Sequence, residues 1–377
     1  MRNETVEVEW PTLLLLAGTY VAWGLATSVL WAALPPLGLL LAAVAIAQHS
    51  SLQHEALHGH PTKNATLNHL LVFPAIGLFY PYLRFRDTHL QHHYDPALTD
   101  PYDDPESNFL DPEVWNKLTP RYQALLRFNN TLAGRMLVGP AIGLVSFIRG
   151  DIAQIKAGNE RIALSWALHG IGVMLALWWI LGVGSMPVWA WVLSAYLGAS
   201  LLKIRTYLEH RAHEKFRART VVIEDKGPLA YLFLNNNYHV VHHMHPNVPW
   251  YKLPEMYAAK REHYQRRNDG YVFKSYSEVF SKYFLKAKDP VPHPVWPVNK
   301  SDAEPDDLPE ETVVVSVGPA APEAAAPVAD IAEEATPKAD APEAVVLEGE
   351  VLDAVVVEAL EEEEPPAKGR KGRKSPS

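Results

Sequence analysis

Histidine is the residue type with which this sequence could carry out its most distinctive chemistry. The chain of 377 residues contains 17 histidines, and twelve of them occur in four short clusters. Neutral imidazole binds iron, zinc, copper and nickel alike, so the clusters predict a metal site without selecting the metal. The twelve residues are His54, His58, His60, His89, His92, His93, His210, His213, His239, His242, His243 and His245.

The spacing within the clusters follows the helical repeat. Residues three and four apart lie on one face of an α-helix. His54 and His58 are therefore expected to converge on one point, and so are His89, His92 and His93. Isolated histidines are expected to be ordinary polar residues, with His169 hydrogen-bonded inside a helical bundle. These are His49, His69, His169, His263 and His293.

One short motif offers a competing interpretation. His54-Glu55-Ala56-Leu57-His58 is an HExxH sequence, which in zinc hydrolases supplies two ligands and a general base. A single catalytic zinc uses three protein ligands, so the surplus of histidines favours two metal ions. A non-enzymatic metal carrier would more naturally place ionisable residues within its membrane spans. An intramembrane zinc protease and a metal carrier are therefore the minor alternatives.

Four membrane-spanning helices are expected to position these clusters. Residues 10–54 and 162–202 contain no Asp, Glu, Lys or Arg. Each stretch is long enough for two crossings, because one crossing needs about 20 residues. Pro and Gly residues indicate tight turns at 34–38 and 182–187. The sequence therefore predicts two helical hairpins.

Two further features refine this prediction. An aromatic belt is indicated around the second turn, formed by Trp178, Trp179, Trp189 and Trp191. Residues 65–83 and 136–148 are weaker span candidates, because the first contains two prolines and the second is short. We interpret both as interfacial or buried helices.

An even number of predicted spans precedes each histidine cluster, so all four clusters are expected at one face of the membrane. The basic clusters lie outside the hairpins, and the positive-inside rule then places both termini and the histidines in the cytoplasm. The sequence therefore predicts an all-α, multi-pass protein of the inner (cytoplasmic) membrane. Its four transmembrane helices carry a cytoplasmic His-rich helical cap.

The composition changes abruptly near residue 300. Residues 301–377 contain 20 Asp or Glu and 6 Lys or Arg, whereas the whole chain has a net charge of −9, so residues 1–300 carry +5. We predict a membrane domain over 1–300 and a disordered acidic Ala/Glu/Pro-rich tail over 301–377. The basic body suits anionic lipid headgroups, and no nucleic-acid partner is expected. The absence of cysteine excludes disulfides, iron–sulfur ligation and a thiol nucleophile.

The order of the motifs resembles a known family. HxxxH, HxxHH, a histidine after the last span and a second HxxHH together resemble the membrane fatty acid desaturase superfamily of histidine-box non-haem di-iron enzymes. Residues 237–246, followed by 249–254, are similar to the third box of bacterial acyl-lipid desaturases, and close versions occur in carotenoid ketolases. Residues 206–210 are similar to the extra-histidine segment of alkane hydroxylases and ketolases.

The resemblance implies nine iron ligands. Position by position, these are His54, His58, His89, His92, His93, His210, His239, His242 and His243. The remaining clustered histidines, His60, His213 and His245, are candidates for additional ligands or supporting residues. Candidates for carboxylates that orient the imidazoles are Glu55, Asp87 and Glu209.

The resemblance also implies a reaction. Two ferrous ions would use O2 as co-substrate to oxidise an unactivated CH2 group, with electrons delivered from elsewhere. The sequence has no Gly-rich dinucleotide turn and no His-Pro-Gly-Gly motif, so a separate ferredoxin-like or cytochrome-like electron donor is implied. We expect desaturation of a lipid acyl chain in the membrane. Hydroxylation or ketolation of a lipid or carotenoid is the alternative.

Overall fold

The computed structural model describes residues 8–94 and 97–298, and the chain within them is mostly helical. The predicted tail over 301–377 lies outside the described residues. The elements are α1 (Trp10–Leu25), the π-helix η1 (Ala26–Leu30), α2 (Trp31–Ala33), α3 (Pro35–Leu57), α4 (Ala65–Leu71), α5 (Tyr82–Tyr94), α6 (Pro112–Lys117), α7 (Pro120–Asn129), α8 (Leu132–Leu137), α9 (Gly139–Lys156), α10 (Glu160–Gly182), α11 (Val188–Thr206), the 3-10 helix η2 (Phe216–Ala218), β1 (Val222–Ile223), α12 (Pro228–Leu232), α13 (His239–Met244), the 3-10 helix η3 (Trp250–Lys252), α14 (Leu253–Ala259), α15 (Arg261–Arg267), β2 (Val272–Phe273) and α16 (Tyr276–Tyr283).

Three helical segments are long and apolar enough to cross a membrane: Trp10–Ala33, Pro35–Leu57 and Glu160–Gly182. They correspond to α1 with η1 and α2, to α3, and to α10, and they match three of the predicted spans in length and hydropathy. The fourth predicted span is α11, which has 19 residues and carries Lys203 and Arg205 in its last turn. These charges shorten its apolar stretch, and its crossing of the membrane stays a prediction.

Both predicted hairpin turns are present, and they pack against each other. The first separates α2 from α3 at Leu34, and the second separates α10 from α11. The wide turn of the π-helix η1 presents the carbonyl of Thr27, which accepts hydrogen bonds from the backbone N–H groups of Ser185 and Met186, both at 3.0 Å. Trp179 Nε1 donates to Thr27 Oγ1 at 3.0 Å. The two turns therefore lie at the same end of the helical bundle.

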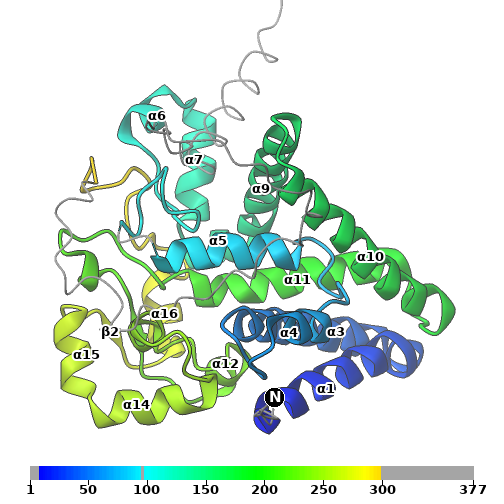
Figure 1. Ribbon diagram of the computed structural model, residues 1–377. Helices are drawn as coiled ribbons and strands as arrows, with labels where there is room; N and C mark the ends of the chain where they lie inside the picture. Colours follow the sequence, from blue (N-terminus) through cyan, green and yellow to red (C-terminus); the bar gives the residue numbers. More distant parts are fainter. Residues whose placement is uncertain (1–7, 95–96, 299–377) are drawn as a thin grey trace, which may run out of the picture.

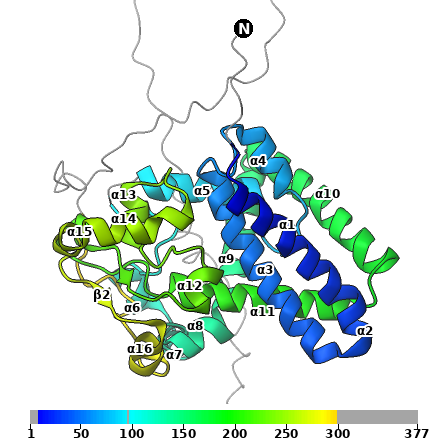
Figure 2. The same cartoon turned by 90° about the horizontal axis from the view of Figure 1, so that it is seen from below.

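Several long helices lie on one side of the molecule, and the short helices near the end of the described chain lie on the other. Figures 1 and 2 show α1, α3, α10 and α11 extending to one side, while α12 to α16 gather on the other. α3 and α11 pack closely, because a Cβ added to Gly198 would lie 2.7 Å from Ile46 Cγ2 and 2.9 Å from the carbonyl of Ala43. Both helices begin at the hairpin turns and end among the histidines. The histidine clusters therefore lie at the end of the bundle away from the turns.

The tryptophans around the second turn have different environments. Trp178 and Trp189 are exposed, as expected of an aromatic belt. The prediction is wrong for Trp191, which is 1% exposed and donates from Nε1 to the carbonyl of Ile76 at 2.9 Å. Trp179 is tied to Thr27 instead of being fully exposed. The period of the helix turns these two side chains toward the bundle.

The weaker span candidates form no long apolar helix in the structure. Residues 65–83 contain the short helix α4 and then an irregular stretch, and 136–148 fall in α8 and α9. Neither segment meets the length and hydropathy of a membrane crossing, as predicted. α9 instead places Asp151 in a buried ion pair with Arg84 of α5, at 2.9 Å.

A small parallel ribbon departs from the all-α prediction. β1 pairs with β2 through Val222 opposite Val272 and Ile223 opposite Phe273. The ribbon supports the last histidine cluster, because the N–H of Val240 donates to the carbonyl of Val221 at 3.1 Å. The N–H of Ile223 donates in turn to the carbonyl of Asn237 at 2.8 Å. The chain on either side of β1 thus fixes where α13 begins.

Candidate metal centre

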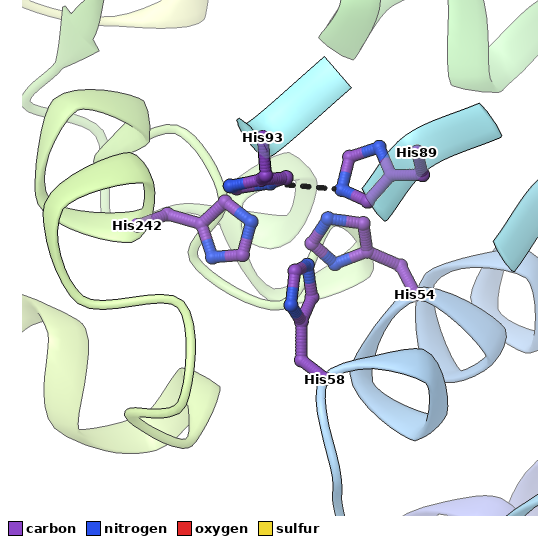
Figure 3. Close-up of side chains that lie close together, drawn as sticks. All are labelled: His54, His58, His89, His93 and His242. Atoms are coloured by element: carbon purple, nitrogen blue, oxygen red, sulfur yellow. Dashed lines mark hydrogen bonds between the residues drawn. The ribbon is translucent and has the colours of Figure 1, made fainter. Parts of the chain in front are cut away.

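Four segments bring the nine implied ligands together. His54 and His58 lie at the end of α3, three histidines lie on α5, His210 follows α11, and three lie on α13. All nine fall into two groups, and within each group the nitrogen atoms lie within 4.8 Å of one another. The first group is His54, His58, His89, His93 and His242, and the second group is His92, His210, His239 and His243. Figure 3 shows the five rings of the first group, from α3, α5 and α13, facing one another.

Each HxxHH cluster is divided between the two groups. His89 and His93 belong to the first group and His92 to the second, so the prediction that all three converge on one point is wrong. Adjacent residues of an α-helix point about 100° apart, since the helix has 3.6 residues per turn. His92 and His93 therefore face different sites. As a result, α5 and α13 each contribute histidines to both of two neighbouring sites.

The second group has the spacing of ligands around one ion. His210 Nε2 lies 2.9 Å from His92 Nε2 and 3.0 Å from His239 Nε2, and His239 Nε2 lies 3.1 Å from His243 Nε2. Adjacent nitrogen ligands about 2.1 Å from one ion are about 3 Å apart. The four nitrogen atoms therefore fit a single metal ion.

The first group contains ring nitrogens that lack a partner. Within the part of the chain that the structure describes, the Nε2 atoms of His54, His58 and His242 are buried and make no hydrogen bond. A buried polar atom without a partner costs about 1–3 kcal/mol. The three ring centroids lie 4.7 to 4.9 Å apart. An ion that accepts these lone pairs would satisfy all three, so this group also fits a metal.

The electrostatics keep most of these rings neutral. Burial and the neighbouring imidazoles hold the pKa of His58, His93 and His242 well below the ordinary value. The same causes lower the pKa of His210, and the pKa of His243 likewise. Metal binding requires neutral imidazole, so these rings are already in the protonation state that binds a metal ion.

Two carboxylates hold rings on α5 in a fixed orientation. His92 Nδ1 donates to Asp104 at 2.7 Å, and His89 Nδ1 donates to Glu106 at 2.6 Å. Burial alone would lower the pKa of His92, but Asp104 and Glu106 raise it to about 9, so this ring must release its Nε2 proton when a metal ion binds. A carboxylate on Nδ1 fixes the tautomer and leaves Nε2 for an ion. Asp104 and Glu106 are therefore the orienting residues for one ring in each group.

These carboxylates differ from those predicted. Asp87 is paired with Arg86 at 2.8 Å and Arg161 at 2.9 Å, so the prediction that it orients a histidine is wrong. Glu55 accepts from the backbone N–H of Trp250 at 3.2 Å and belongs to neither histidine group. Of the predicted carboxylates, Glu209 lies nearest to a ligand, 3.8 Å from His239 Nδ1 and 3.0 Å from Arg205.

The three extra clustered histidines lie outside both groups. His60 Nδ1 donates to Glu9 at 2.7 Å, and His213 Nε2 lies 3.3 Å from Asp269. The ring of His245 packs against that of Tyr264. Among the isolated histidines, His169 Nε2 donates to the carbonyl of Leu78 at 2.8 Å, which confirms its predicted role in the bundle. His49 contacts Tyr20, and His293 contacts Thr99.

A cavity of about 340 Å³ is connected to the first group through Glu106, because none of the nine histidines lines it but Glu106 does and bonds to His89. Residues of α3, α5, α9 and α11 line it, together with residues from the segments 75–80, 105–110 and 126–135 and with Val291. Glu106, the partner of His89, lines the cavity, as do Phe85 and Thr88 on α5. A ligand in this cavity would therefore approach the histidines from the side of α5.

Comparison with known proteins gives independent findings. A family model described as fatty acid desaturase matches residues 29–275, more than half of the chain. The β-carotene ketolase of Paracoccus sp. (strain N81106 / MBIC 01143) is 40% identical over 81 residues, and that of Paracoccus sp. (strain PC1) is 38% identical over 81 residues. These alignments cover 20% of this chain and 34% of each ketolase, so the chain matches about a third of the length of these curated relatives.

Proposed function

Because the chain belongs to the fatty acid desaturase family, we propose that it catalyses the O2-dependent oxidation of an unactivated C–H bond in a lipid acyl chain, with desaturation as the reaction. The observation that carries this proposal is the division of nine histidines into two neighbouring groups. Two sites built only from imidazole suit a pair of iron ions. Family membership and this geometry point to the same kind of chemistry.

The residues have distinct roles in this proposal. The first histidine group would hold one ferrous ion and the second group the other. When bound, the two ions supply the activation of O2 that removal of hydrogen from a CH2 group requires. Asp104 and Glu106 keep the rings of His92 and His89 in the orientation that leaves Nε2 free. The cavity would hold the chain of the substrate alongside α5.

The electrons come from another protein in this proposal. The sequence contains no cysteine and no dinucleotide-binding glycine motif, so the reductant would be ferredoxin-like or cytochrome-like. The basic body of residues 1–300 would attract an acidic donor. This arrangement needs the histidine cap in the cytoplasm and the four helices in the inner membrane, with the domain over 1–300 separate from the tail over 301–377.

The second candidate is a ketolase or hydroxylase of the same superfamily. The similarity to the two β-carotene ketolases favours it. Desaturation and hydroxylation share the first hydrogen removal and differ in how the carbon radical then reacts, which depends on the position of the chain. The zinc protease receives no support, because the carboxylate of Glu55 is bonded to the backbone of Trp250 and nine histidines form two sites.

Expression in a host that lacks the activity, followed by mass spectrometry of total lipid, tests the proposal. Loss of two hydrogens from an acyl chain is the expected result. Gain of one oxygen on an acyl chain would indicate hydroxylation instead. An unchanged acyl profile with an oxygenated carotenoid would replace the proposal with the ketolase. His92→Ala in the same host is the control, and it should abolish any of these products.

A further inference from the structure

The cavity connected to the first histidine group through Glu106 has a polar end and an apolar end. At the polar end, Arg135 bonds to neighbours that also line the cavity, Asn108, Asn129 and Asn130. At the apolar end, Ile46 and Ala195 belong to a hydrophobic core formed mainly by the long helices, and Leu78 packs against this core.

The two ends are separated along α11. Ala195 of α11 lies at the apolar end of the cavity. Thr206, at the end of α11, lies at the polar end, because the hydroxyl of the next residue, Tyr207, donates to the carbonyl of Asn130 at 3.0 Å. Eleven residues of α-helix, at 1.5 Å each, span about 16 Å. Glu106 lies on the cavity wall and bonds to His89. The cavity is therefore long and amphiphilic, and Glu106 connects its wall to His89 of the first histidine group.

Arg135 is a buried cation whose partners are neutral. Its side chain is 5% exposed. Nε donates to the carbonyl of Asn129 at 3.0 Å, and the other nitrogens donate to the amide oxygens of Asn130 (3.2 Å) and Asn108. Burial lowers the pKa of Arg135 to about 10, so the group is still charged near neutral pH. A buried charge is costly without a counter-charge, and none of its partners in the described chain is a carboxylate.

The nearest acidic side chains have other partners. Asp289, whose carbonyl accepts from Asn130, pairs through its carboxylate with Lys288 at 2.8 Å. Glu106 bonds to His89. On the cavity wall, Arg205 pairs with Glu209, so the charge of Arg135 is the one that these carboxylates leave uncompensated. The polar end thus carries positive charge that a bound anion would offset.

Other lining atoms also lack partners within the described residues. Asn129 Oδ1, Ser146 Oγ and Thr206 Oγ1 are buried without a hydrogen bond, and all three residues line this cavity. Ser146 as a whole is 7% exposed. A pure hydrocarbon would leave these atoms unsatisfied, at a cost for each. A ligand with oxygen atoms in its head group would satisfy them.

We propose that the substrate is an anionic amphiphile, whose carboxylate or phosphate binds Arg135 while its hydrocarbon chain extends past Glu106 toward Ile46 and Ala195. This inference rests on the proposed function and narrows its substrate class. It favours a fatty acid or an acidic phospholipid over a neutral carotenoid. Arg135 is then a specificity-determining residue, set apart from the metal ligands.

Binding to the purified full-length protein in a neutral detergent tests the proposal without any turnover. Displacement of a fluorescent fatty acid is measured with palmitate, methyl palmitate, palmitoyl lysophosphatidylglycerol and β-carotene. A charge-assisted hydrogen bond predicts that an anionic ligand binds about tenfold more tightly than the methyl ester, or better. Tighter binding of palmitate identifies a free carboxylate as the head group, and tighter binding of the lysophospholipid identifies a phosphate.

Variants assign the preference to one residue. Arg135→Gln should bind palmitate and its methyl ester equally, and Arg135→Lys should keep part of the preference, because the charge remains. Arg127→Gln, at an exposed position on α7 that does not line the cavity, should behave as the unchanged protein.

Two results would overturn the inference. One is equal affinity of the unchanged protein for acid and ester, a result that does not depend on the folding of any variant. The other is an undiminished preference for the acid in folded Arg135→Gln. Equal affinities for palmitate and methyl palmitate, together with an oxidised acyl chain in the expression host, would reject this inference and leave the proposed reaction intact. A clear preference without any oxidised lipid would reject the proposed reaction alone.

Discussion

Replacing Asp104 with asparagine should weaken one of the two metal sites selectively. Asp104 is 1% exposed and accepts three hydrogen bonds, from His92 Nδ1 (2.7 Å), the N–H of Thr99 (2.7 Å) and the N–H of Glu106 (2.9 Å). Asparagine offers one acceptor oxygen. If that oxygen keeps His92 and Glu106, the amide NH2 must face the N–H of Thr99.

The magnitude follows from these contacts. Two donors facing each other in a buried site cost about 1–3 kcal/mol of folding free energy. Loss of a carboxylate partner behind a metal-bound histidine lowers metal affinity about 10- to 100-fold, which is about 1.4–2.8 kcal/mol. His92 belongs to the second group alone. Asp104→Asn should therefore lose one iron per chain to a chelator at a concentration that leaves the other bound.

The assay is iron content by elemental analysis across a chelator titration. Asp87→Asn is the matched control, because Asp87 lies on the same helix as His92 but pairs with arginines. It should follow the unchanged protein. If Asp87→Asn released iron while Asp104→Asn retained both ions, the assignment of the orienting carboxylates would be refuted.

Three further predictions concern the scaffold. Gly198→Ala should lower the free energy of unfolding in detergent by about 1–3 kcal/mol, because the added Cβ would lie within 3 Å of α3 atoms. Gly170→Ala, with open space around it, is the control and should not destabilise the protein. Equal melting temperatures of the two variants would contradict this packing. Gly182→Cys should label from outside intact cells and Lys226→Cys only after permeabilisation, and the reverse pattern would invert the topology. Deletion of 301–377 should leave turnover within a few-fold, and loss of iron from the truncated protein would show that the tail supports the site.

The sequence was sufficient to predict which histidines come together, because helical spacing, recurrence and the family resemblance make the clusters visible. It also located both hairpin turns through Pro and Gly, since these residues restrict the backbone locally. The all-α prediction holds except for the ribbon of β1 and β2, whose strands have two residues each and leave almost no pattern.

The pairing of ligands into groups was harder to predict. By helical spacing alone, residues three positions apart and residues four positions apart are equally good neighbours on one helix face. The actual split between His92 and His93 depends on how α5 is rotated against α3 and α13, which is set by tertiary packing. The orienting carboxylates were missed because Asp104 and Glu106 lie in an irregular segment more than ten residues after their partners. The acidic run 100–106 was the one available indication.

The most direct test of the two-site account is the metal content of the purified, active protein. We expect two irons per chain, one for each histidine group. His242→Ala should deplete the iron of the first group and His92→Ala that of the second, and each substitution should abolish oxidation of lipid. A preparation that is fully active with a single zinc and no iron would contradict the account.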